Sequence, residues 1–102
     1  MHLIQILLPL YDNEGEALDE ALFQEVRKEL VERFGGLTGY TQTPVEGLWK
    51  DDPEHTTRDE LVIFEVMAKE IDSAWWRSYR ETLERRFRQE QIVVRAQQIE
   101  LL

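Results

Sequence analysis

Three polar residues, Gln5, Glu65 and Arg95, interrupt the apolar segments IQILL, IFEVM and VVRA. An amide, a carboxylate and a guanidinium could together hold a polar ligand, with Glu65 as a proton acceptor and Arg95 orienting an anionic group. The three could equally pair with one another, because a charge buried in an interface needs a partner. These residue types therefore predict either a ligand pocket or a polar cluster that fixes how two copies of the chain meet.

Aromatic candidates for the same pocket lie at the two ends of GYTQTPVEGLW, residues 39–49. Tyr40 and Trp49 could form an aromatic wall there or reach across a dimer interface. His55 could help to close the pocket. The candidate ligand-binding residues are thus Gln5, Tyr40, Trp49, Glu65 and Arg95, and the catalytic candidates are Glu65, Arg95 and His55.

Neither a metal site nor a cofactor site is predicted. His55 lies in the acidic segment DDPEHTTRD, but the spacing matches no calcium loop, and the other histidine, His2, is far away in the sequence. The glycines of RFGGLTG follow a helical pattern and do not open one, so they match neither a dinucleotide fingerprint nor a Walker loop.

The composition excludes several classes of function. The 102 residues contain no cysteine, which removes disulfides, thiolate nucleophiles and cysteine metal sites. A net charge of -9 disfavours binding to nucleic acid and to anionic membranes. The opening segment MHLIQILLPLY lacks a basic leader and is too short to span a bilayer. We therefore expect a cytoplasmic protein with no nucleic-acid partner and no membrane partner.

Apolar periodicity predicts six elements in the order βαββαβ. Strands are expected at residues 2–10, 37–43, 61–68 and 91–99. The first helix carries an apolar stripe from Leu18 to Phe34 and stops at Gly35 and Gly36. The second helix begins after Asp72 as N-cap. The outer face of the first helix is expected to carry its acids, Glu20, Glu25, Glu29 and Glu32.

This order predicts a single α+β domain over residues 1–102 with a ferredoxin-like plan, in which both helices cover one face of an antiparallel sheet of order 4-1-3-2. That order places Gln5 between Glu65 and Arg95 and allows a polar row. The uncovered face is too apolar for a monomer and predicts a homodimer with twofold symmetry. Its residues are Leu3, Gln5, Leu7, Leu61, Ile63, Glu65, Met67, Val93, Arg95 and Gln97.

Several short segments together resemble a family of small uncharacterised bacterial proteins: LLPLYDNEG, RFGG, EGLW, FEVM, the WW pair, LERRFRQE and IVVRA. More broadly, the chain is similar to the dimeric α+β barrel proteins, a ferredoxin-like group that includes small monooxygenases, EthD-like proteins and muconolactone isomerase-like enzymes. The resemblance implies a dimeric barrel and brings no established active site with it.

Three functions stay open at this point. The first is a small homodimeric protein that is non-catalytic or binds a small ligand. The second is a cofactor-independent enzyme, monooxygenase-like or isomerase-like, acting on a small organic molecule. The third is a protein-interaction module that uses Trp75 and the acidic first helix.

Overall fold

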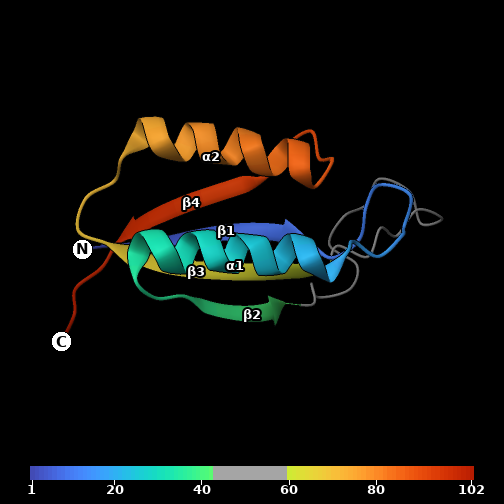
Figure 1. Cartoon of the computed structure of the whole chain (residues 1–102). Coiled ribbons are helices and arrows are strands. Elements are labelled where there is room, and N and C mark those ends of the chain that lie inside the picture. The colour runs from blue at the N-terminus through green and yellow to red at the C-terminus, as the bar shows by residue number, and fades with distance from the viewer. Residues whose placement is uncertain (43–59) are drawn as a thin grey trace, which may run out of the picture.

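Six elements follow one another along the chain in the predicted order (Figure 1). The structure is a computed structural model that describes residues 1–42 and 60–102. The elements are β1 (His2–Pro9), α1 (Glu20–Phe34), β2 (Thr38–Gln42), β3 (Leu61–Ala68), α2 (Ser73–Arg86) and β4 (Val93–Gln98). The strands differ from the predicted ranges by at most two residues at an end, where pairing stops.

The four strands form one sheet of order β2-β3-β1-β4, and each neighbouring pair is antiparallel. This is the predicted order read from the opposite edge. The strand β1 is central, and its register places Gln5 opposite Glu65 of β3 and opposite Arg95 of β4. All three residues therefore lie at one level across the sheet.

Local sequence signals set the ends of both helices. Asp19 precedes α1 and its carboxylate accepts from the backbone N–H of Ala21 at 3.0 Å. Gly35 ends α1 in a left-handed conformation, with φ at 79°, which costs glycine little. Asp72 caps α2 by accepting from Trp75 N at 3.1 Å. These caps confirm the predicted helix stop and the predicted N-cap.

One face of the sheet is closed by the two helices, which run along it in Figure 1. The residues that β1 and β3 turn toward the helices are at most 8% exposed: Ile4, Ile6, Leu8, Val62, Phe64 and Val66. They form one cluster with helix residues, among them Phe23, Val26 and Leu30 of α1 and Trp76, Tyr79 and Leu83 of α2. Because this face excludes water within a single chain, it is the folding core of the chain.

Neither of the two described helices lies over the opposite face (Figure 1). Tyr40 on β2, Met67 on β3 and Val93 on β4 are 41%, 52% and 46% exposed. Ile63 departs from this pattern, because it is 1% exposed although it lies on the same face. Its register partners on the neighbouring strands are Leu7 and Tyr40.

Candidate functional site

Four side chains form a hydrogen-bonded line across the uncovered face, which we call the polar row: Tyr40, Glu65, Gln5 and Arg95. Arg95 Nε donates to Gln5 Oε1 at 2.7 Å. Gln5 Nε2 and the Tyr40 hydroxyl each donate to Glu65 Oε1 at 2.7 Å. Gln5 Nε2 also lies 3.2 Å from the Tyr40 oxygen. The row therefore joins all four strands of the sheet.

The register explains why these four residues meet. Gln5 is the paired residue of both Glu65 and Arg95, and side chains paired across strands stand close together. Tyr40 pairs with Ile63, while Thr38 pairs with Glu65. Tyr40 is thus the diagonal neighbour of Glu65, a separation that a long aromatic side chain spans.

The hydrogen bonds give the polar row a direction. The Gln5 amide turns its oxygen to Arg95 and its nitrogen to Glu65, so the row has a positive end on β4 and a negative side on β3. The hydrogen bond to Glu65 raises the pKa of Tyr40, helped by its partial loss of solvent and by the carboxylate charge. The Tyr40 hydroxyl therefore stays a protonated donor to a higher pH than an ordinary tyrosine does.

Four of the six predicted site residues lie within the described part of the chain, and the structure brings these four together. Gln5, Tyr40, Glu65 and Arg95 share the polar row, whereas Trp49 and His55 lie outside the described residues. Arg95 and Glu65 do not form a direct ion pair, because Gln5 stands between them. Their role as a ligand site stays a prediction.

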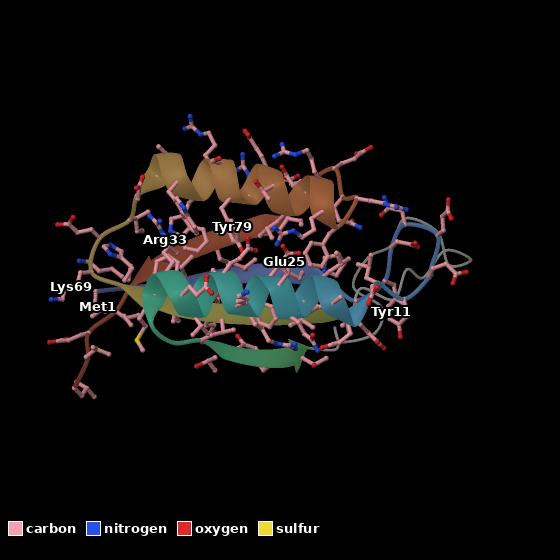
Figure 2. The ribbon with its side chains drawn as sticks, in the orientation of Figure 1. Met1, Tyr11, Glu25, Arg33, Lys69 and Tyr79 are labelled. Carbon is pink, nitrogen blue, oxygen red and sulfur yellow. The ribbon has the colours of Figure 1, made fainter. Side chains whose placement is uncertain are left out.

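A second polar cluster, which the sequence reasoning missed, lies between the two helices. Arg86 of α2 binds Glu29 of α1 through two nitrogens, Nη1 to Oε1 at 2.5 Å and Nη2 to Oε2 at 3.2 Å. The Tyr79 hydroxyl donates to the same Glu29 Oε1 at 3.2 Å. Figure 2 shows Tyr79 and Glu25 in this space, and Glu25 Oε1 lies 3.9 Å from Arg86 Nη2.

The expectation that Glu29 faces solvent is therefore wrong. Glu29 lies at the margin of the apolar stripe, where the neighbouring helix can reach it. Burial raises the pKa of Tyr79, and the Glu29 carboxylate raises it further. The hydrogen bond to Glu29 also raises the pKa of Arg86. Tyr79 and Arg86 are seven residues apart, which puts both on one face of α2. This spacing is the sequence signal that could have predicted the contact.

The Trp75 side chain makes several contacts within the chain. The Arg33 guanidinium carbon lies 3.9 Å from the centroid of its ring, and Tyr79 stacks on the ring at 4.8 Å and 15°. Phe34 and Trp76 meet it edge to face. These contacts attach the start of α2 to the end of α1, and Trp75 stays partly exposed. Its use in binding a partner protein stays a prediction.

Within residues 1–42 and 60–102, no group of three histidine, aspartate or glutamate side chains is placed to hold a metal ion. In the same part of the chain, no helix has the length and apolarity to cross a membrane.

Comparisons with known proteins support the fold. No protein-family model matches the sequence, and a search of curated proteins finds no significant relative. Among solved structures, the chain is similar to a phage SAM lyase in complex with S-methyl-5′-thioadenosine. The two share a TM-score of 0.63 and 14% sequence identity over 94% of this chain and 79% of that chain. At this identity the likeness shows a shared small α+β fold, and membership of the dimeric α+β barrel group stays a prediction.

Proposed function

We propose that the protein is a non-catalytic homodimer that works by binding, and that two copies join through the uncovered face with the polar row at the centre. The observation that carries the proposal is the polar row itself. It is a hydrogen-bonded set of opposite charges in the middle of an apolar surface that the chain's own helices leave open.

The apolar side chains around the polar row support the proposal that a protein partner covers this face. Exposed aliphatic or aromatic side chains lie on three strands of this face, as Tyr40, Met67 and Val93. Contiguous apolar patches on soluble proteins mark interaction sites once they exceed a few hundred Å². Face-to-face packing of two such sheets, about 10 Å apart, would cover Met67 and Val93.

The contacts within the polar row favour binding over catalysis. A general base must direct a free lone pair at the substrate; Oε1 of Glu65 already accepts from two donors, so a base would have to act through Oε2 alone. Tyr40 is protonated and already donates to Glu65. The phage protein is a lyase, but its activity does not carry over to this chain, because a fold shared at 14% identity hosts many chemistries.

The dimer is tested by light scattering after size-exclusion chromatography at micromolar protein concentrations. The expected mass is twice the 12.2 kDa of the chain. Val93→Lys on the uncovered face should reduce the mass to that of a monomer. Val31→Lys is the matched control, because Val31 on α1 has the same 46% exposure, and it should leave the dimer intact. A wild type that is monomeric at these concentrations would remove the proposal.

A second candidate, binding of a small organic ligand, rests on one further observation. Among the described residues, Glu65 Oε2 and the terminal nitrogens of Arg95 make no hydrogen bond. A ligand with an anionic group for Arg95 and an N–H or O–H donor for Glu65 would fit these atoms.

The ligand is tested with two pairs of measurements by titration calorimetry. Benzoate should bind more tightly than benzamide, and Arg95→Gln should remove that difference. S-methyl-5′-thioadenosine, the molecule bound to the phage protein, supplies amine and hydroxyl donors, and any heat that it gives should be lost in Glu65→Gln. Equal signals from benzoate and benzamide, with no heat from the nucleoside, would exclude this candidate.

A further inference from the structure

We infer that the two copies are related by a twofold axis running along β1, so that each Glu65 faces the partner's Arg95. This inference rests on the proposed homodimer and adds its geometry. The partner surface is thus a second copy of the same polar row, turned end for end.

The inference begins from an imbalance inside one protomer. Glu65 and Arg95 lie one strand to either side of Gln5, about 5 Å away in each direction. Gln5 bridges them, and within residues 1–42 and 60–102 no direct ion pair neutralises either charge. If another sheet covered them, each charge would need an opposite charge from that sheet.

Two simple twofold axes could stack the sheets, and the charges distinguish them. An axis across the strands would place Glu65 over the partner's Glu65 and Arg95 over the partner's Arg95. An axis along β1 exchanges the two sides of that strand, so on each side of the axis it places an Arg95 over the partner's Glu65. Like charges brought together in an interface cost several kcal/mol, which selects the axis along β1.

The apolar residues fit the same axis. Leu7 pairs with Ile63 on one side and with Val93 on the other. The exchange of sides would therefore set Leu7 over its own copy and bring the 46% exposed Val93 to the partner's β3. Because β1 is not the middle of the four-strand sheet, β2 would extend beyond the partner, and Tyr40 would remain reachable at the rim.

Charge reversal tests the pairing. Glu65→Arg alone and Arg95→Glu alone should each weaken the dimer at least about 100-fold in sedimentation equilibrium, because each variant creates two like-charge contacts across the axis. A mixture of the two variants should form a dimer again, since every contact in that heterodimer joins opposite charges. Pairing within one chain cannot explain this recovery, because each variant carries the same charge at position 65 as at position 95.

The outcomes separate this inference from the proposed dimer. A monomeric wild type defeats the dimer itself. A dimeric wild type whose single variants stay equally dimeric defeats the axis along β1 and leaves the dimer standing, because like-over-like stacking is insensitive to either change. Monomeric single variants that do not recover on mixing also overturn the axis.

Cross-linking gives a second measurement that does not depend on the folding of charge-reversed variants. The chain has no cysteine, so Leu7→Cys introduces a unique thiol over the proposed axis, about 10 Å from its copy. A short bismaleimide should join the two copies in high yield. Thr38→Cys on β2 is the control, because its copies would be about 20 Å apart. Equal yields from the two variants, or none from Leu7→Cys, would overturn the inference.

Discussion

The same strands build both faces of the sheet, but the two faces differ in how far they are buried. On the helix side, Ile4, Ile6 and Leu8 of β1 are at most 1% exposed. On the other side, Leu3, Gln5 and Leu7 alternate with them and are half-buried. The first face is completed within one chain and stabilises the fold. The second is left apolar with a polar row at its centre, which is the pattern of a surface that meets something else.

Removal of side chains from neighbouring positions of β1 should give the largest contrast between the faces. Ile6→Ala is expected to lower the free energy of unfolding by about 3 kcal/mol, because it leaves a cavity in a site with no exposure. Leu7→Ala should cost about 1 kcal/mol or less in dilute protein, where copies are separate, and more at high concentration. Urea denaturation at two protein concentrations measures both. If both variants lose the same unfolding free energy in dilute protein, the two faces do not differ in their contribution to the stability of the chain.

Gly39 tests the helix-facing side at the edge strand β2. A Cβ there would lie 3.0 and 3.1 Å from two ring carbons of Phe64, which is 1% exposed and cannot move aside freely. Gly39→Ala should therefore cost about 1 to 2 kcal/mol of unfolding free energy. For Gly36→Ala, the added Cβ would meet no heavy atom of the described chain within 4 Å, so urea denaturation should show no loss. A neutral Gly39→Ala would contradict the close packing of this face.

The helix layer that closes the first face depends on the contact between Glu29, Tyr79 and Arg86. Glu29→Gln should cost about 1 to 2 kcal/mol of unfolding free energy, because it replaces a two-pronged, charge-assisted contact to Arg86. Glu32→Gln on the same helix is exposed and should change stability by less than about 0.5 kcal/mol. If both variants unfold at the same urea concentration, the contact between the helices does not stabilise the fold.

Alkaline pH should loosen the same helix layer through Tyr79. Its pKa is raised in the folded protein, chiefly by burial, whereas the unfolded chain ionises near pH 10. The stability that the neutral phenol confers is present below about pH 10 and falls as pH rises further, by at most about 1.4 kcal/mol per pH unit. Tyr79→Phe should flatten the fall in stability between about pH 10 and 11.5, and the exposed Tyr11→Phe should not. If stability falls equally steeply with pH in the wild type and in both variants, the ionisation of Tyr79 does not cause the fall.

Much of the first face could be predicted from the sequence, since alternation of side chains along strands fixes which residues are buried together. Gln5, Glu65 and Arg95 could be assigned to one face for the same reason, but their level across the sheet depends on register, which periodicity does not encode. Tyr40 joins them by a diagonal contact that needs the same information. Glu29 was misplaced because its environment depends on how α2 is rotated against α1, which one helix's pattern does not contain.

The central claim, that the uncovered face joins two copies, is tested most directly by isotope-filtered nuclear Overhauser spectroscopy on a mixture of labelled and unlabelled protein. Contacts between copies are expected from the methyl groups of Leu3, Leu7, Met67 and Val93. None are expected from Ile6 or Leu8, which the helices cover. An absence of contacts between copies from the first set, or contacts that come from the outer faces of the helices, would contradict the account.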